Sequence, residues 1–381
     1  MSEVSEREPL RVALDVLPLA GPPTGVGVCC DQLLRSLVAR ADVDVRAFAV
    51  ARKAAGIRER LPPGVPFRPL AVPTRLLHGA WRYLGIPTAD FVAGPVAVVH
   101  GTNFVVPPPR GVATVVTVND VTPWKYPGLC APATRSYPRL VQQAVRRGAF
   151  VHTASHQVAG ELSELLGVRL ESVRVIPYGV PPPVPPPGPA LVEGPYVLAI
   201  STIEPRKDYP TLVKAFAALA GAHSGLRLVV AGAEGRGSAA LDAAVAATGL
   251  ADRVVRLGYV EDPVRSSLLA GARALAYPSL YEGFGFPPLE AMAAGVPVVA
   301  TAGGAVPEVV GDGAVVVPVG DVAALAGALE QVLEDEVLRA DLVRKGHAQV
   351  GRYSWAATAE AMVSLYFEAA AAAAHEAPAR G

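Results

Sequence analysis

Two glutamates near the C-terminal end of the chain, Glu282 and Glu290, stand eight positions apart and enclose a short glycine-rich loop. The apolar run before them, residues 274–278, has the pattern of a buried strand that ends at the loop. Glycines let a backbone approach a ligand closely, and Pro287 and Pro288 suit the first turn of a helix whose free N–H groups attract phosphate. A first-turn charge that only stabilises the helix would explain Glu290 but not Glu282. Because carboxylates also accept hydrogen bonds from hydroxyls, the pattern predicts a ligand with phosphates and hydroxyls, such as a nucleotide sugar.

Basic and glycine-rich loops follow other predicted strands. Arg206 and Lys207 come after the strand-like run 196–200, at a helix start, where both side chains suit a diphosphate. Taken alone, a solvated basic turn explains them equally well. Gly25 and Gly27 follow the first strand and resemble a phosphate loop, but a third glycine at dinucleotide spacing is missing. A nicotinamide-dependent enzyme is therefore a poor interpretation.

Polar residues end two further predicted strands in the first half of the chain. His100 follows the run 96–99, and Asn119 and Asp120 follow the run 114–118. At the carboxyl end of a parallel sheet such side chains are placed to contact a sugar or an acceptor. A local capping role explains Asp120 or His100 equally well from sequence alone.

Composition limits the class of protein. The chain has 381 residues, which suits two domains, and carries 34 basic and 34 acidic residues, so nucleic acid is not an expected partner. No apolar run is long enough to span a bilayer, and the first nine residues lack the apolar core of a signal peptide. The three cysteines have no metal-ligand spacing. These features predict a cytoplasmic protein without a metal site.

Strand-like and helix-like runs alternate along the whole chain, which predicts an α/β protein with parallel sheets. The dense prolines between 181 and 195 predict a stiff, extended linker. We therefore expect a first doubly wound, Rossmann-like domain over residues 1–180 and a second one over 196–354. Residues 355–381 are expected to form a helix that packs back across the domains and ends in a frayed tail. Ligands of such sheets bind beyond the carboxyl ends of the strands, so we expect the site there, in a cleft that both domains face.

The combination of these motifs resembles the retaining glycosyltransferases of family four, which have the two-domain GT-B fold. The resemblance extends over nearly the whole chain and is closest to the mannosyltransferase-like members. The segments that carry it are Thr24–Gly27, the Ser155 region, Ile176–Val180, Glu204–Lys207, Gly258–Val260, Pro278–Ser279, the Glu282–Glu290 block and Pro307–Val309.

The resemblance implies roles at matching positions. It implies a metal-independent hexosyltransferase that needs no cofactor and uses a nucleoside-diphosphate sugar as donor. The acceptor implied is a sugar or a lipid-linked molecule, in the synthesis of a glycan, polysaccharide or glycolipid. The residues implied to bind the donor are Gly25, Gly27, Arg206, Lys207, Val260, Gly283, Phe284, Gly285, Phe286 and Glu290; those implied to be catalytic are Glu282, Asp120, Asn119 and His100.

One position departs from the family pattern. Many relatives have His-Asp where this chain has Asn119-Asp120, and an asparagine cannot be protonated at neutral pH. This departure motivates one alternative, a sugar-nucleotide-binding partner protein with weak or no catalysis. A separate alternative is a phosphorylase-like enzyme of the same fold that uses phosphate or water as acceptor. The run 75–84 mixes basic and aromatic residues, and it fits either a helix on the protein's own core or a contact with the inner face of a membrane.

Overall fold

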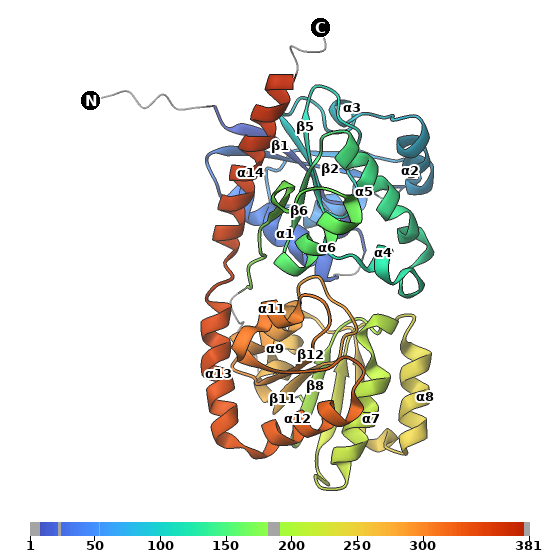
Figure 1. Ribbon diagram of the computed structural model, residues 1–381, viewed down its shortest axis with the longest axis vertical. Helices are drawn as coiled ribbons and strands as arrows, with labels where there is room; N and C mark the ends of the chain where they lie inside the picture. The colour runs from blue at the N-terminus through green and yellow to red at the C-terminus, as the bar shows by residue number, and fades with distance from the viewer. Residues whose placement is uncertain (1–7, 22–23, 53, 182–190, 377–381) are drawn as a thin grey trace, which may run out of the picture. The chain divides into compact units, whose positions relative to one another are not determined.

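The computed structural model describes residues 8–21, 24–52, 54–181 and 191–376, and the chain divides into two compact units. Unit 1 comprises residues 1–179 and 355–381, and unit 2 comprises residues 180–354. Each unit has its own parallel sheet and its own core (Figure 1). Residues 182–190 of the predicted linker lie outside the described residues.

Unit 1 is built on a seven-stranded sheet with the order β3-β2-β1-β4-β5-β6-β7. Every pairing in it is parallel, and Val12 at the centre of β1 lies opposite Val45 and Val98. The strands are short and rich in valine, as expected for a sheet covered on both faces. They are β1 (Leu10–Asp15), β2 (Val43–Val50), β3 (Phe67–Leu70), β4 (Val98–Gly101), β5 (Ala113–Thr117), β6 (Phe150–Thr153) and β7 (Val173–Val175).

The helices of unit 1 connect these strands. The first begins at Gly25, where the Thr24 hydroxyl accepts a hydrogen bond from the Gly27 N–H at 3.2 Å and caps the helix. The helices are α1 (Gly25–Val38), α2 (Thr74–Tyr83), α3 (Ala89–Ala93), α4 (Thr122–Lys125), α5 (Tyr137–Arg146), α6 (His156–Leu166) and α14 (Trp355–Glu376).

The last helix, α14, belongs to unit 1 although it follows unit 2 in the sequence. It packs against α1 and β5, as Figure 1 shows in red. Thr358 donates a hydrogen bond to the Pro177 carbonyl at 2.7 Å, and Tyr366 is fully buried with its hydroxyl 2.7 Å from the Nδ1 atom of His100. The C-terminal residues thus complete the core of the first sheet.

Unit 2 repeats the architecture with six parallel strands in the order β10-β9-β8-β11-β12-β13. Its core forms where Leu212 and Phe216 pack against the sheet. The strands are β8 (Tyr196–Ile200), β9 (Arg227–Ala231), β10 (Val254–Gly258), β11 (Ala274–Tyr277), β12 (Val298–Thr301) and β13 (Ala314–Val317). The helices are α7 (Tyr209–Ala220), α8 (Ser238–Thr248), α9 (Asp262–Gly271), α10 (Phe286–Ala293), α11 (Val306–Val310), α12 (Val322–Glu334) and α13 (Glu336–Val350).

The predicted fold class, two doubly wound parallel α/β sheets, is confirmed. The sequence pattern missed β3, a four-residue edge strand that contains Pro69 and has no fully buried residue. It also placed β4 two residues too early, at 96–99 rather than at Val98–Gly101. Within the described residues, no helix combines the length and the apolar character needed to cross a bilayer.

The contact between α14 and the first sheet leads to a prediction. Tyr366→Phe removes the hydroxyl that bonds His100 and leaves a buried ring nitrogen without its partner, so the variant should lose about 1–3 kcal/mol of stability. Thermal unfolding followed by circular dichroism measures this loss. The matched control is Tyr83→Phe, because the Tyr83 side chain is 73% exposed. Equal unfolding temperatures for the two variants would contradict the assignment.

Candidate functional site

Three loops of unit 2 leave neighbouring strands at the same edge of the sheet. Strand β8 pairs with β11, and β11 pairs with β12, all in parallel. Their carboxyl ends therefore lie side by side, and the loops that begin at Ser201, Pro278 and Ala302 emerge together. This arrangement brings the predicted Arg206, Lys207 and Glu282 into one cluster.

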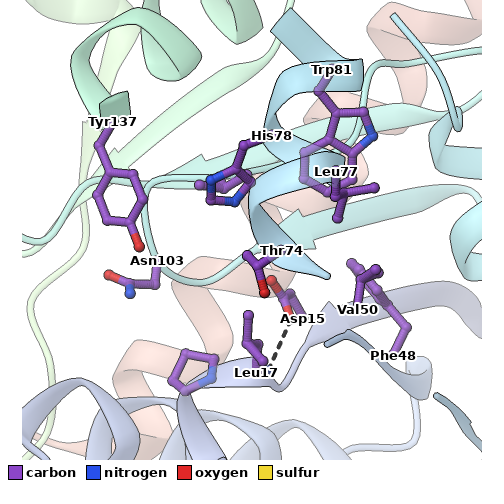
Figure 2. A pocket seen from close by; sticks show the side chains of 12 residues that line it. Asp15, Leu17, Phe48, Val50, Thr74, Leu77, His78, Trp81, Asn103 and Tyr137 are labelled. Carbon is purple, nitrogen blue, oxygen red and sulfur yellow. Dashed lines mark hydrogen bonds between the residues drawn. The ribbon is translucent and has the colours of Figure 1, made fainter. Parts of the chain in front are cut away.

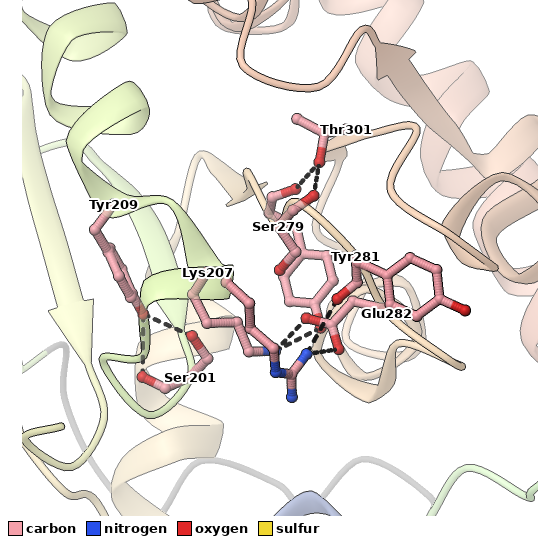
Figure 3. Close-up of polar contacts among 9 residues, drawn as sticks. Ser201, Lys207, Tyr209, Ser279, Tyr281, Glu282 and Thr301 are labelled. Atoms are coloured by element: carbon pink, nitrogen blue, oxygen red, sulfur yellow. Dashed lines mark hydrogen bonds and ion pairs between the residues drawn. The ribbon is translucent and has the colours of Figure 1, made fainter. Parts of the chain in front are cut away.

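Glu282 is the centre of this cluster. Its side chain is only 8% exposed, and its two carboxylate oxygens face different cations, as Figure 3 shows. Arg206 donates to Oε2, and Lys207 donates to Oε1. Both interactions are charge-assisted hydrogen bonds in a site from which most water is excluded.

Burial alone would raise the pKa of the Glu282 carboxyl, because the charged form loses its hydration. The charges of Arg206 and Lys207 and their hydrogen bonds outweigh this effect and lower the pKa to about 2. Glu282 is therefore a carboxylate throughout the physiological range. It cannot act as a general acid there, but it can accept hydrogen bonds or stabilise positive charge.

Lys207 is as buried as its carboxylate partner. Its Nζ atom also lies 3.1 Å from the hydroxyl of Tyr277 and 5.0 Å from the centre of that ring. Burial, followed by the charge of Glu282, raises the pKa of Tyr277 well above its ordinary value, so its hydroxyl stays protonated. Arg206 differs, because its side chain is 28% exposed and its guanidinium also donates to the Tyr281 carbonyl at 3.2 Å. The arginine is thus the member of the cluster that a ligand reaches first.

The backbone fixes both ends of the cluster. Asp208, directly after Lys207, has the left-handed φ of +44°, which turns the chain from the basic loop into α7. On the other side, Ala305 N–H donates to the Glu282 carbonyl at 2.8 Å, and Glu282 N–H donates to the Gly303 carbonyl at 3.2 Å. A Cβ on Gly304 would lie 2.4 Å from the Glu282 carbonyl oxygen, so only glycine fits there.

Sequence reasoning missed Gly303 and Gly304. Their signal is a pair of glycines directly after a buried strand, followed by Pro307 and Glu308 of the next short helix. Glycines have no side chain to offer a ligand, but the backbones of these two residues hold Glu282 in place.

Glu290 is not part of this carboxylate–cation cluster. It is the fifth residue of α10, beyond the first turn, and not at the helix start as the sequence suggested. Two residues of that turn, Pro287 and Pro288, have no N–H to offer a ligand. Its carboxylate forms an ion pair with Arg265 of α9, a partner that sequence reasoning missed. The helix itself begins and ends as predicted, with Pro287 and Pro288 in its first turn and Gly295 just beyond its end.

The glycine-rich loop between the two glutamates is almost entirely buried. Gly285 has a φ of +124°, which only glycine adopts easily, and the rings of Phe284 and Phe286 lie 5.1 Å apart. Gly283 lies in the bend directly after Glu282. Val260, half-buried, lies just before α9, which also carries Arg265. The loop is thus a rigid backbone surface rather than a mobile segment.

The candidate residues of unit 1 form a separate group. Gly25 and Gly27 occupy the first turn of α1, with a free space beside Gly25 and the Pro18 carbonyl close to Gly27. Asn119 accepts a hydrogen bond from Tyr178 at 2.7 Å and donates to Asn103 at 3.2 Å. Asp120 accepts a hydrogen bond from the Thr122 N–H at 2.8 Å, the capping role that sequence reasoning left open.

His100 is fully buried inside unit 1. Its Nδ1 atom is bonded to Tyr366 and its Nε2 atom to Thr117, each at 2.7 Å, and Thr117 continues the chain to His152. Burial, followed by the charge of His152, lowers the pKa of His100 well below its ordinary value. We expected His100 to face a ligand, but the structure gives it a packing position in which both ring nitrogens are occupied.

Comparison with known proteins identifies the family of the chain. Residues 188–349 match the family described as Glycosyl transferases group 1, and residues 24–179 match the Glycosyl transferase 4-like domain. The chain belongs to the group 1 glycosyltransferases. This assignment confirms the resemblance seen in the sequence motifs.

Two relatives illustrate the range of the family. The chain is 28% identical to the D-inositol 3-phosphate glycosyltransferase of Acidothermus cellulolyticus over 93% of its own length and 88% of that protein. It is 34% identical to the O-antigen chain mannosyltransferase B of Escherichia coli, but over 162 residues that span only 42% of either chain.

Solved structures show the same fold. Sucrose-phosphate synthase from Thermosynechococcus elongatus superposes with a TM-score of 0.73 at 21% identity, covering 95% of this chain and all of that one. Anabaena HepE in complex with UDP and glucose gives a TM-score of 0.68 at 17% identity, covering 93% of this chain and 98% of that one. At such identities the likeness establishes the GT-B fold and nothing more specific.

The ion cluster predicts how stability depends on pH. The pKa of Glu282 is about 2 in the folded protein and 4.5 ordinarily, so the unfolded chain takes up a proton at a higher pH than the folded one. Stability should therefore fall as the pH drops from about 4.5 toward 2. At pH 7 the free energy of unfolding of Glu282→Gln should be about 3 kcal/mol lower than that of the wild type, because two cations lose their carboxylate. Between pH 4.5 and pH 2 the variant should lose less stability than the wild type, because it has no carboxylate at this position to protonate.

Calorimetric unfolding at pH steps between 7 and 2 measures both effects. Glu336→Gln is the matched control, because the Glu336 side chain is 92% exposed. A parallel loss of stability below pH 4.5 in the wild type and in Glu282→Gln would show that another carboxylate controls the transition.

Proposed function

We propose that this protein is a retaining hexosyltransferase that moves a sugar from a nucleoside-diphosphate donor to a hydroxyl acceptor. The observation that carries the proposal is the cluster of Glu282, Arg206 and Lys207 at the carboxyl edge of the second sheet. Two cations and one carboxylate leave this cluster one positive charge in excess, which suits a diphosphate. The family assignment supports the same chemistry.

Different residues of the site would contact different parts of the donor. Arg206, the more exposed cation, would meet the diphosphate first, and Lys207 would stabilise the negative charge that develops on the leaving group. Glu282 and the backbone of the loop Gly283–Phe286 would hold the sugar. Glu290 and Val260 would lie at the nucleoside.

The proposed reaction needs no metal ion, because fixed side-chain cations and the α10 helix dipole can neutralise the leaving diphosphate. Configuration would be retained by attack of the acceptor hydroxyl on the same face from which the diphosphate leaves. Asn119 has its amide engaged with Asn103 and Tyr178, so it would act as a fixed hydrogen-bonding group and not as an acid or base.

Mannose is the sugar that we propose first. Several relatives are mannosyltransferases, among them the Escherichia coli O-antigen enzyme and a phosphatidyl-myo-inositol mannosyltransferase of Mycobacterium leprae. Other relatives transfer different sugars, so the base and the sugar of the donor are best found by experiment. The product would then be a mannosylated glycan, polysaccharide or glycolipid.

A binding experiment tests the donor site. Wild-type protein is titrated with GDP, UDP, ADP and dTDP and with their sugars, without metal, and binding is read from the unfolding temperature. One base should stabilise the protein, and Lys207→Ala should weaken that binding at least tenfold because a buried cation facing the diphosphate is lost.

Lys214→Ala is the matched control for this titration, because Lys214 lies on the adjacent helix α7 and is exposed. Release of the diphosphate from the stabilising sugar nucleotide, with an acceptor panel, then measures transfer. If the sugar nucleotide binds but no diphosphate is released with any acceptor of the panel, a non-catalytic partner protein is favoured. If release of the sugar requires inorganic phosphate, a phosphorylase is favoured. No stabilisation by any nucleotide would overturn the proposed donor site.

We also propose that unit 1 contacts the inner face of a membrane from the cytoplasm. Five large apolar side chains on α2, on α3 and on the segment that joins them are strongly exposed, with Leu76, Tyr83 and Leu84 each at about 70%. The others are Ile86 at 55% and Phe91 at 60%. Arginines lie over two of the rings, Arg82 over Tyr83 and Arg68 over Phe91. Apolar side chains flanked by cations are suited to an anionic lipid surface.

Flotation with vesicles tests this contact. Wild-type protein should float with vesicles that contain anionic lipid and remain in solution with neutral ones, and the double variant Leu76→Ser with Leu84→Ser should lose most of the binding. Val337→Ser is the control, because Val337 is an 80% exposed apolar side chain of unit 2. Equal flotation of all three proteins would exclude this surface as the contact.

A further inference from the structure

Each unit brings a tyrosine side chain next to other polar groups. In unit 1, Figure 2 shows Tyr137 at a pocket that Asp15 and Asn103 also line. In unit 2 the tyrosine is Tyr277, the last residue of β11, whose side chain is almost fully buried. Tyr277 differs from Tyr137 in its partner, because its hydroxyl contacts Lys207, a cation that the proposed function assigns to the donor.

The ammonium group of Lys207 is held from two different parts of the chain. Its Nζ atom donates to Oε1 of Glu282, on the loop after β11, and to the Tyr277 hydroxyl at 3.1 Å, on the strand itself. The same atom lies 5.0 Å from the centre of the Tyr277 ring. A lysine has a long, flexible side chain, so a single hydrogen bond leaves its charged end free to turn. The second acceptor restricts that movement.

The position of Tyr277 is itself fixed by the sheet and by the glycine-rich loop. Tyr277 pairs with Ala300 of β12, and its carbonyl accepts a hydrogen bond from the Thr301 hydroxyl at 3.4 Å. On the loop side, a Cβ built on Gly285 would lie 3.9 Å from the Tyr277 ring. The ring is therefore packed between strand and loop, and its hydroxyl is a stationary point of attachment for the lysine.

The other cation of the cluster has a similar support of a different kind. Arg206 donates to Glu282 and also to the Tyr281 carbonyl at 3.2 Å. Each cation thus bonds the shared carboxylate and also a neutral oxygen. The Tyr281 oxygen belongs to the backbone, whereas the Tyr277 oxygen belongs to a side chain. Because phenylalanine differs from tyrosine only by this oxygen, the support of Lys207 can be removed with little change in the shape of the core.

The Tyr277 hydroxyl remains neutral in this position. Burial, followed by the charge of Glu282, raises the pKa of Tyr277 well above its ordinary value. A neutral hydroxyl accepts a hydrogen bond from the ammonium without cancelling its charge, which a second carboxylate would do. The cluster of Arg206, Lys207 and Glu282 therefore keeps its excess positive charge while the lysine is held in place.

We propose that Tyr277 is a positioning residue of the donor site, whose hydroxyl holds the Lys207 ammonium where it meets the diphosphate. Tyr277 acts through Lys207 and not by touching the donor. This inference rests on the proposed function, because it explains how one of the two cations assigned to the donor keeps its place.

A double-mutant cycle with the full-length protein tests the proposal. The proteins are the wild type, Tyr277→Phe, Lys207→Ala and the double variant, and the probe is whichever of GDP, UDP, ADP and dTDP stabilises the wild type most. Titration calorimetry on the folded proteins gives the affinities. Tyr277→Phe alone should weaken binding about tenfold, because a hydrogen bond to a charged group is lost. When Lys207 is already alanine, the same substitution should change the affinity by less than about twofold, because the group that it positions is gone.

Tyr196→Phe is the matched control. Tyr196 begins the neighbouring strand β8, is fully buried, and donates its hydroxyl to the Leu268 carbonyl at 2.7 Å. This variant also loses a buried hydrogen bond, so its unfolding temperature should fall to a similar degree, but its nucleotide affinity should equal that of the wild type. If Tyr277 had only a structural role, the two tyrosine variants would bind the nucleotide equally well.

Unchanged affinity in Tyr277→Phe, or an equal loss with and without the Lys207 side chain, would overturn the inference and leave the proposed function intact. If Tyr277→Phe does not fold, Tyr277→Met carries the same test, because methionine fills irregular space and is only a weak hydrogen-bond acceptor. If no nucleoside diphosphate binds the wild type, the proposed function is refuted and the inference with it.

Discussion

The ionised state of one buried carboxylate, Glu282, determines the arrangement of the candidate site in unit 2. Without Arg206 and Lys207, burial would favour its neutral form, and without the carboxylate the two cations would lack compensation in a nearly dry environment. The three loops that carry these charges come from adjacent strands, and backbone bonds to Gly303 and Ala305 fix the central one. Sheet order, loop conformation and charge are thus mutually dependent.

This balance of charges also affects how the cluster would receive a diphosphate. A pair of cations prepared for a diphosphate would repel each other, but the carboxylate between them removes that cost before any ligand arrives. A diphosphate would therefore add to a cluster whose cations are already partly compensated by the carboxylate. The exposure of Arg206, compared with the burial of Lys207, provides one accessible charge for the first contact.

Much of the fold could be predicted from the sequence because buried parallel strands are continuous apolar runs. All twelve strand-like runs in the sequence overlap strands that pair in parallel, and the run at β4 is displaced by two residues. Edge strand β3 gave no such signal. In the site, Arg206, Lys207 and Glu282 were predictable from their place after strands. Arg265 and Gly304 were not, because their positions depend on contacts between distant segments. The prediction for His100 was wrong because a histidine at a strand end has the same local sequence pattern whether it faces a ligand or packs against a helix such as α14.

The return of α14 to unit 1 has a consequence for how the chain folds during synthesis. Unit 2 is one continuous segment, whereas unit 1 needs residues on both sides of it. The ribosome delivers residues 8–179 before unit 2, yet Tyr366 and Met362, which fill the core beside α1 and β5, emerge after unit 2. Unit 2 is consequently the first part of the chain that can complete its core, and the N-terminal segment keeps an open apolar surface until α14 has been made. A short C-terminal deletion would therefore damage the half of the protein that is made first.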